Sequence, residues 1–501
     1  MSNVGSYGTI LKSSSIIGGA SVISMMLGMV RTKFAAILIG TGGIGMLASF
    51  TAIQSIVGTI AGLGIQTSAV REVAAAVAKK DNEAIGRAVL TLHRVCWFTG
   101  LLGMICLMAF SPFIAQFTFG SNEHALEVAA LGLIILFANL SGGQIALIQG
   151  MRRIGDIARL TIIGGVIITL LTVGFYLWLG LRGIVPALVL GAAFQLIVSW
   201  KYAQRVPVPK VDMTWAESFF EAGSMVKLGV VMMWNALMVS SIAYITIALI
   251  TNQLGLQAVG IYSAAFTLSG MFVNFVFQAM GADYFPRLIG VAPDKAAMNH
   301  MVNEQAEIGF LLAVPGLLAT LCLAPWIIHI LYTSEFLPAA DLLQWFILGC
   351  LVKVIIWPVG FVMMALGKGK WFFITETSFT VVILVLTFVG LQSLGLEGVA
   401  IAYFLSYLIY VALVYGVAVK LISFKWAPGV RRLFFMLLPL VGVVFVSSRL
   451  LPVLPATFLG IAMSAIASIL CLRGLVHRVG KEHRLTRAAF RIPGVKLICG
   501  V

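Results

Sequence analysis

The sequence has few charged residues, few histidines and few cysteines. Only 10% of the residues are charged whereas 60% are apolar, a balance that excludes a soluble globular protein. The six histidines are dispersed, with neither an HExxH motif nor a pair spaced for zinc, so we expect no metal site. Five of the six cysteines lie inside apolar segments and none belongs to a CxxC motif, which argues against a disulfide framework.

Enzyme motifs are also missing from any context that would support them. The run Gly40-Thr41-Gly42-Gly43-Ile44-Gly45 has the spacing of a nucleotide-binding motif, but it follows a membrane helix rather than a strand, and we interpret it as a turn. The longest predicted outer loops, near 118–126 and 332–341, are too short for the external domain of a glycan polymerase. We therefore expect a non-enzymatic protein with no catalytic residue and no cofactor.

Long apolar stretches make up most of the chain, and each is long enough to cross a hydrocarbon core of about 30 Å. The first is too long for a cleavable signal peptide. This pattern predicts an all-α integral membrane protein with fourteen crossings, near residues 13–39, 46–67, 95–118, 126–149, 160–180, 183–200, 228–250, 259–281, 308–332, 341–366, 371–392, 398–419, 433–451 and 456–475.

The second half of the chain repeats the first half at a constant offset. Gly45 recurs as Gly260, and the turn Gly180-Leu181-Arg182-Gly183 recurs at the same offset as Gly395-Leu396-Glu397-Gly398. Each repeat holds six stretches, and an even number brings both repeats into the membrane from the same side, as in many transporters. We predict three domains: two six-helix bundles related by a pseudo-two-fold axis, at 1–205 and 206–425, and two further transmembrane helices with a basic tail at 426–501.

Basic residues cluster in alternate loops and in the tail, from Arg473 to Lys496. The opposite loops carry only Arg182 and Arg449. The positive-inside rule then puts both termini in the cytoplasm. The net charge of +15 is spread over short inner loops that face anionic lipid, so we expect membrane lipid rather than nucleic acid as the partner of these charges.

Lys353 is the most informative polar residue because it lies about 12 residues from either end of its apolar stretch. At about 1.5 Å per residue it sits near the bilayer midplane, too deep for its ammonium to reach the headgroups. Either it lines a wet cavity that receives an anion, or it pairs with a polar neighbour and only braces the bundle.

Arg31 and Lys33 lie closer to a membrane surface, where a snorkelling side chain is an alternative to a cavity. Two residues at this spacing on a helix point roughly 200° apart, so both cannot face one cavity. We favour Arg31 as the inward residue and keep Lys33 as a second candidate.

Glu376 lies about 9 Å inside its helix, deep enough for an unpaired carboxylate to be costly. It is either a carboxylate that titrates in a proton-coupled carrier or an interfacial residue bonded to Lys368 or Lys370. Asp283 and Arg287 flank Pro286 and form either a gate or a solvated helix end.

Several polar and aromatic residues have the chemistry to contact sugars. Tyr403, Tyr407 and Tyr410 follow one another at helical spacing on one face, where ordinary packing is the alternative. Intramembrane amides bond sugar hydroxyls or join helices. The candidates are Gln54, Asn235, Asn274, Tyr403 and Tyr407.

The order of many short motifs resembles the oligosaccharidyl-lipid flippases. The first hairpin carries Leu27-Gly28-Met29-Val30-Arg31 and Gly62-Leu63-Gly64-Ile65, and the second repeat carries Val259-Gly260-Ile261-Tyr262 and Phe285-Pro286-Arg287-Leu288. Lys353 is followed by Gly360 and by Glu376. Over residues 5 to about 420 the chain looks like a Wzx-type flippase of the multidrug/oligosaccharidyl-lipid/polysaccharide exporter superfamily, to which the MATE transporters also belong.

The resemblance implies a function. Such proteins carry undecaprenyl-diphosphate-linked oligosaccharide, for example an O-antigen or common-antigen unit, across the bacterial inner membrane by alternating access, and other polysaccharide assembly proteins are possible partners. Lys33, Lys353 and Glu376 fall on charged positions of that pattern. Cys350 departs from it, because a related protein would have an acid there. A MATE-like or lipid II-type exporter is the alternative function, and a glycan polymerase is disfavoured.

Overall fold

The computed structural model describes residues 3–79, 81–209 and 211–479, all of it helices, turns and short connections without a strand. The prediction of an all-α integral membrane protein is confirmed. The chain forms two compact units: unit 1 consists of Met1–Gly260 with Leu331–Thr333, and unit 2 consists of Ile261–Ile330 with Ser334–Val501. The domain boundary predicted at 205 and 206 stays a prediction.

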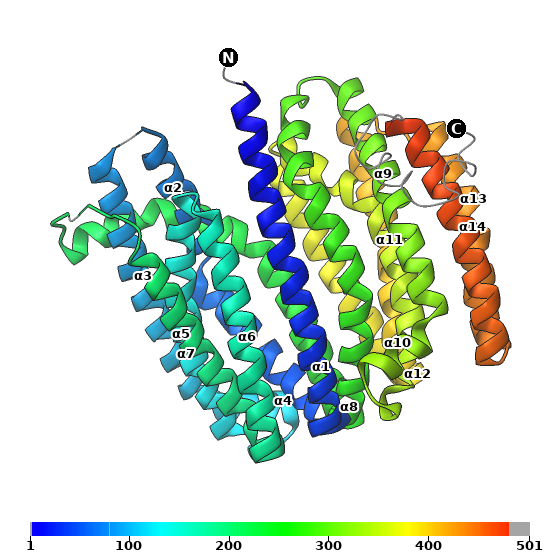
Figure 1. The fold of residues 1–501 in the computed structure, drawn as a ribbon, viewed down its shortest axis with the longest axis horizontal. Helices are drawn as coiled ribbons and strands as arrows, with labels where there is room; N and C mark the ends of the chain where they lie inside the picture. Colours follow the sequence, from blue (N-terminus) through cyan, green and yellow to red (C-terminus); the bar gives the residue numbers. More distant parts are fainter. Residues whose placement is uncertain (1–2, 80, 210, 480–501) are drawn as a thin grey trace. The chain divides into compact units, whose positions relative to one another are not determined.

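Unit 1 is a bundle in which helices far apart in sequence lie side by side (Figure 1). Within it, α3 and α7 pack on α5, and α6 packs on α1. Its elements are α1 (Asn3–Gly62), α2 (Ile65–Lys79), α3 (Asn82–Ala109), α4 (Ser111–Phe119), α5 (Ala125–Gly150), α6 (Ile154–Leu179), the 3₁₀ helix η1 (Gly180–Gly183), α7 (Ile184–Ala203) and the first part of α8 (Trp215–Gly290).

Unit 2 repeats this plan and adds two helices. In it α11 packs on both α9 and α12, and α13 and α14 cover α9. Its elements are the rest of α8, then α9 (Lys295–Cys322), α10 (Ala324–Leu331, whose last residue belongs to unit 1), the 3₁₀ helix η2 (Ser334–Phe336), α11 (Ala339–Ala365), α12 (Gly369–Ile422), α13 (Pro428–Leu450) and α14 (Val453–Val479).

Ten helices in the described part of the chain are long and apolar enough to cross a membrane. Four of these spans are 45, 50, 46 and 54 residues long, about twice what a core of ~30 Å requires. Each is broken by one glycine with positive φ: Gly40, Gly180, Gly255 or Gly395. We interpret each of the four broken spans as two crossings. These eight crossings and the other six spans give the fourteen crossings predicted.

The break at Gly395 folds α12 back on itself. Tyr410 bonds Glu376 at 2.7 Å although the two are 34 residues apart, and a straight helix would separate them by about 50 Å. At the turn the backbones of Gly390 and Gly398 approach so closely that a Cβ added to Gly398 would lie 1.9 Å from the Gly390 oxygen. Both glycines are therefore required by the tight hairpin.

The breaks keep the predicted offset, because the separation of Gly40 from Gly255 equals that of Gly180 from Gly395 and that of Gly45 from Gly260. The close backbone contact between the two repeats inside unit 1 has the same offset. A Cβ on Gly45 would lie 1.9 Å from the oxygen of Leu256, and a Cβ on Gly260 would lie 2.0 Å from the oxygen of Thr41. The internal repeat predicted from sequence is thus present in the backbone.

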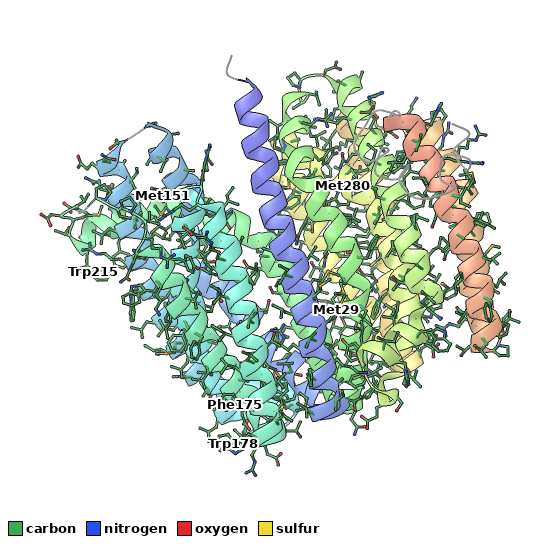
Figure 2. All side chains as sticks on the ribbon, viewed as in Figure 1. Met29, Met151, Phe175, Trp178, Trp215 and Met280 are labelled. Carbon is green, nitrogen blue, oxygen red and sulfur yellow. The ribbon has the colours of Figure 1, made fainter. Side chains whose placement is uncertain are left out.

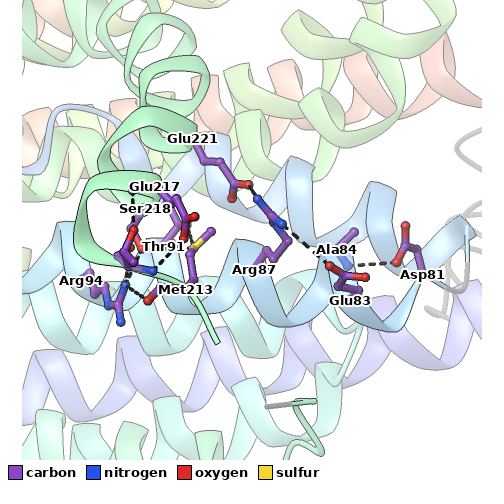
Figure 3. A network of polar contacts seen from close by, with 11 residues as sticks. Asp81, Glu83, Ala84, Arg87, Thr91, Arg94, Met213, Glu217, Ser218 and Glu221 are labelled. Carbon is purple, nitrogen blue, oxygen red and sulfur yellow. Dashed lines mark hydrogen bonds and ion pairs between the residues drawn. The ribbon is translucent and has the colours of Figure 1, made fainter. Parts of the chain in front are cut away.

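The start of α3 differs from its predicted boundary at residue 95. The helix begins at Asn82 because the Asp81 side chain accepts the Ala84 N–H and caps it. Arg87 and Arg94 fall between the predicted stretches 46–67 and 95–118 and lie on this polar first part of α3. Arg87 pairs with Glu221 in the first turns of α8, and Arg94 donates to the carbonyls of Met213 and Thr214, which lead into α8 (Figure 3).

The first turn of α8 is closed by a reciprocal cap. The Thr214 N–H donates to the Glu217 carboxylate at 2.8 Å, and the Glu217 N–H donates to the Thr214 hydroxyl. The bond from the Thr214 backbone lowers the pKa of Glu217 from its usual value. Trp215 starts this helix at one end of unit 1, and Trp178 lies at the other end (Figure 2). Tryptophans at both ends are typical of a membrane-spanning bundle.

Candidate functional site

Lys353 lies in α11 among aromatic rings of unit 2. Its ammonium is 5.7 Å from the centre of the Phe277 ring and 5.9 Å from that of Tyr407. Phe277 in turn stacks on Trp357 at 4.7 Å. No carboxylate forms an ion pair with Lys353 among the residues that the structure describes. Ring faces attract a cation without neutralising it, so the site retains a positive charge that an anion can meet.

The three tyrosines predicted on one face of α12 form a continuous ring cluster. The Tyr403 and Tyr407 ring centres are 4.9 Å apart, and those of Tyr407 and Tyr410 are 6.3 Å apart. Tyr403 also packs against Phe346 at 5.3 Å, and its hydroxyl lies 3.8 Å from the Cys350 sulfur. The structure thus brings Lys353, Tyr403 and Tyr407 together, while a role in sugar contact stays a prediction.

Glu376 has a partner that we did not predict. Its carboxylate accepts a bond from the Tyr410 hydroxyl at 2.7 Å, across the α12 hairpin. Neither Lys368 nor Lys370 forms an ion pair with it in the described chain. Because the donor is a neutral phenol, no cation fixes the carboxylate in its charged form, and both protonation states of Glu376 can be accommodated.

Arg31 lies in unit 1, where it lines a cavity of about 270 Å³ that we call the Arg31 cavity. The other polar side chains of its lining are Ser24, Thr161 and Gln195, so Arg31 is the one charged residue there. Lys33 instead donates to the backbone carbonyl of Tyr332. The two cations have different surroundings, as their nearly opposite directions on the helix predict.

The remaining candidates are scattered. The Asp283 side chain lies outside the described residues, and Arg287 is exposed, while the intervening Tyr284 is buried and donates to the Pro358 carbonyl at 2.8 Å. A gate formed by Asp283 and Arg287 stays a prediction. Asn235 and Asn274 are exposed, whereas Gln54 lines a second cavity of unit 1.

That second cavity holds the polar residues that sequence reasoning missed. Its volume is about 510 Å³, and it includes Ser55, Thr59 and Asn139 besides Gln54. Serine and threonine give little signal in an apolar helix because their hydroxyls bond the backbone one turn earlier, as Thr59 bonds the Ser55 carbonyl. The internal repeat could have pointed to this cavity from the sequence. At the repeat offset the residue equivalent to Lys353 is Ala138, which also lines the cavity.

Residues 36–341 match the model of a family described as polysaccharide biosynthesis protein. The chain belongs to this family. Among its relatives are proteins named Lipid III flippase in Escherichia coli strain K12 and in Shigella flexneri. Each is 23% identical over 418 residues, which is 82% of this chain and 98% of the relative.

Several solved structures share the fold of this chain. An inward-facing multidrug resistance MATE transporter of the MOP superfamily matches with a TM-score of 0.68 at 14% identity, over 80% of this chain and 94% of that one. The lipid II flippase MurJ in an inward closed conformation matches with a TM-score of 0.64 at 15% identity, over 93% and 100%. The predicted MATE-like fold is confirmed, and the MurJ match extends over more of this chain.

Proposed function

We propose that the protein is a flippase that moves a lipid-linked oligosaccharide across the membrane by alternating access, and that it is a transporter rather than an enzyme. Membership of the polysaccharide biosynthesis family and the flippase names of its relatives support the cargo class. The MATE-like fold supports the transport mechanism.

The observation that carries the proposal is the unneutralised Lys353 deep inside α11. The residue lies 14 positions after Ala339 and 12 before Ala365, about 20 Å from each helix end and therefore near the middle of a core of ~30 Å. A charge at this depth costs about 3 kcal/mol on insertion scales. A lysine that only braced the bundle would be expected to have a carboxylate partner, whereas Lys353 has aromatic rings.

The diphosphate and hydroxyls of a lipid-linked glycan cannot enter hydrocarbon unaided. In the proposed mechanism Lys353 and Arg31 offset the diphosphate charge, with Lys33 as a further candidate, while amides and tyrosines bind sugars loosely. The lipid tail stays in the bilayer. Rocking of one bundle against the other then alternates access, and Asp283 with Arg287 contributes to the gate.

The charge pattern supports an orientation of the protein in its membrane. We propose that the protein lies in the bacterial inner membrane with both termini in the cytoplasm, because the basic residues cluster in alternate loops. An O-antigen or common-antigen unit is the proposed cargo, and assembly proteins of the same polysaccharide are proposed partners. The three predicted domains, 1–205, 206–425 and 426–501, are kept in this proposal.

A MATE-like exporter of cationic drugs is the rival function. Such a protein needs carboxylates where its cargo binds. In unit 2 the ammonium of Lys353 faces rings, and in unit 1 Arg31 is the one charged residue among those that line its cavity. Glu376, which is partly buried, is the one carboxylate among our predicted site residues whose side chain the structure describes. This balance favours an anionic cargo.

Lys353→Ala tests the proposal in a strain that lacks its own flippase. We expect surface glycan, normalised to membrane protein, to fall to background, because Lys353 is the charge that the proposal places near the midplane. Lys353→Arg should retain part of the activity, since the charge persists in a different shape. Lys420→Ala is the matched control, because the Lys420 ammonium lies 4.9 Å from the Trp371 ring but in the last turn of α12.

Normal glycan export by Lys353→Ala would remove the role of this lysine in binding the diphosphate. A loss that follows only the amount of protein in the membrane would return Lys353 to a bracing role. Export that responds to a cationic drug rather than to lipid-linked glycan would favour the MATE-like alternative.

A further inference from the structure

The larger cavity of unit 1 is chemically unlike the surroundings of Lys353. Its volume of about 510 Å³ lies within the range of about 300–1,000 Å³ that is typical of ligand pockets. Helices α1, α2, α5 and α8 line it, and all of these lining residues belong to unit 1. We call it the Asn139 cavity after its most buried amide.

The polar side chains that line the Asn139 cavity are all uncharged. Seven of its side chains carry a hydroxyl or an amide, including Thr51, Gln54, Ser55, Thr59, Thr67 and Asn139, and none is charged or aromatic. Two of these hydroxyls meet a third: the Ser240 hydroxyl lies 3.2 Å from those of Ser55 and Thr59. A hydroxyl can donate and accept, so this group adapts to ligand hydroxyls of either kind.

Asn139 has hydrogen-bonding capacity that the protein leaves unused. The residue is 4% exposed, and its Nδ2 atom has no partner in the described structure. Its Oδ1 atom points toward Gly62, where an added Cβ would lie 3.6 Å away. Buried amides are normally paired. Asn139 belongs to the lining of this cavity, so a ligand there can supply the missing acceptor when the amide turns toward it.

We infer that the Asn139 cavity is a binding subsite for uncharged sugar rings, with Asn139 as its anchoring amide. The inference rests on the proposed function and deepens it by assigning the glycan to a place distinct from Lys353. A diphosphate would find no cation in this lining, and a cationic drug would find no carboxylate or aromatic ring. Pyranose hydroxyls match its amides and hydroxyls, and without a stacking ring they bind weakly enough to be released.

Saturation-transfer NMR on the full-length protein in lipid nanodiscs tests this inference. The probes are the methyl glycosides of glucose, galactose, mannose, rhamnose and N-acetylglucosamine, with the methyl glycosides of glucuronic and galacturonic acid for comparison. We expect transfer to at least one neutral glycoside and weaker transfer to the two acids. Asn139→Leu should weaken binding about threefold to tenfold, because one bond to a ligand hydroxyl is lost.

Two matched controls make the result specific. Gln344→Leu removes another amide, 3% exposed and also with an unpartnered atom, from unit 2, and should leave transfer unchanged. Lys420→Ala, outside this lining, should also leave it unchanged. Gln54→Leu, on a different helix of the same cavity, serves where Asn139→Leu is not recovered as folded protein, and should weaken transfer as well.

Several outcomes would overturn the inference: no transfer to any neutral glycoside, transfer to the acids as strong as to neutral sugars, wild-type binding by both cavity variants, or an equal loss in Gln344→Leu. Sugar binding is measured here without transport. Failure of the flippase proposal in the Lys353 experiment therefore leaves this result interpretable, and the reverse also holds.

Discussion

The two repeats share a backbone plan but differ in what fills their interiors. At the offset that relates Gly45 to Gly260, Lys353 in α11 is equivalent to Ala138 in α5. Its neighbours Phe277 and Cys350 are equivalent to Gly62 and Ile135. In the first repeat the three equivalent residues line the Asn139 cavity, whereas in the second a lysine, a phenylalanine and a cysteine occupy those positions.

A second pair of equivalent positions shows the same divergence. Glu376 and Tyr410, which bond each other in unit 2, are equivalent to Thr161 and Gln195, which line the Arg31 cavity in unit 1. At this pair of positions both repeats carry polar groups, and the repeats differ in that only the second carries a carboxylate. The difference teaches that one duplicated framework can supply both an uncharged subsite and a cationic one for a cargo that has both kinds of chemistry.

The largest expected effect is on stability, and it tests the structural equivalence of the two repeats at Gly45 and Gly260. Gly45→Ala and Gly260→Ala each place a methyl group within about 2 Å of the opposing backbone oxygen, of Leu256 and Thr41 respectively. Because backbone cannot rotate away, we expect each to lower the free energy of unfolding by ~3 kcal/mol. Thermal unfolding of the purified protein measures this.

Gly42→Ala is the control for that pair, because its Cβ would meet only the Gln257 side chain, at 3.9 Å. We expect it to change stability by less than ~1 kcal/mol. If Gly45→Ala and Gly260→Ala changed the free energy of unfolding by clearly different amounts, this would contradict a symmetric backbone contact between the repeats.

A smaller effect is expected when the first repeat is given the lysine of the second. Ala138 is exposed in the Asn139 cavity, so Ala138→Lys fills the space with a charged side chain. We expect binding of the neutral glycosides to fall at least about tenfold, a change of ~1.4 kcal/mol. Unchanged binding in the nanodisc experiment would show that sugars bind elsewhere, and Ala138→Ser is the matched control.

The smallest effect concerns the carboxylate that has no counterpart in the first repeat. Glu376→Gln keeps an acceptor for Tyr410 but cannot titrate. On the hypothesis that transport is proton-coupled, a gradient of one pH unit supplies ~1.4 kcal/mol per proton, and the variant should lose a stimulation of up to about tenfold. Flipping rates in vesicles with and without a gradient measure it, and equal stimulation of both proteins would return Glu376 to a structural role.

Sequence reasoning predicted most of the fold because apolar length and glycine position are local properties. The predicted stretch 126–149 is α5 (Ala125–Gly150), and 341–366 is α11 (Ala339–Ala365). It failed at α3, whose first turns are polar and are stabilised by a cap and by the distant pair Arg87–Glu221 rather than by hydrophobicity.

Sequence reasoning could predict only those candidate-site residues whose side chains are costly to place in a membrane without a partner. Lys353 and Arg31 stood out because a charge in hydrocarbon requires an explanation. Tyr410, the partner of Glu376, did not stand out, because it comes close to Glu376 only when α12 folds back at Gly395. The Asn139 cavity was hidden for a related reason: Asn139, Thr59 and Ser240 become a site only when three helices meet.

The hairpin turns have a consequence for the biogenesis of the protein. Between α6 and α7 the connection is the four-residue η1, and at Gly395 a single residue breaks the helix. A connection this short does not allow one flanking helix to reorient without the other. We therefore expect the two helices of each pair to enter the membrane together. An insertion error at such a pair would omit or add two crossings together, and the side on which all later segments emerge would be preserved.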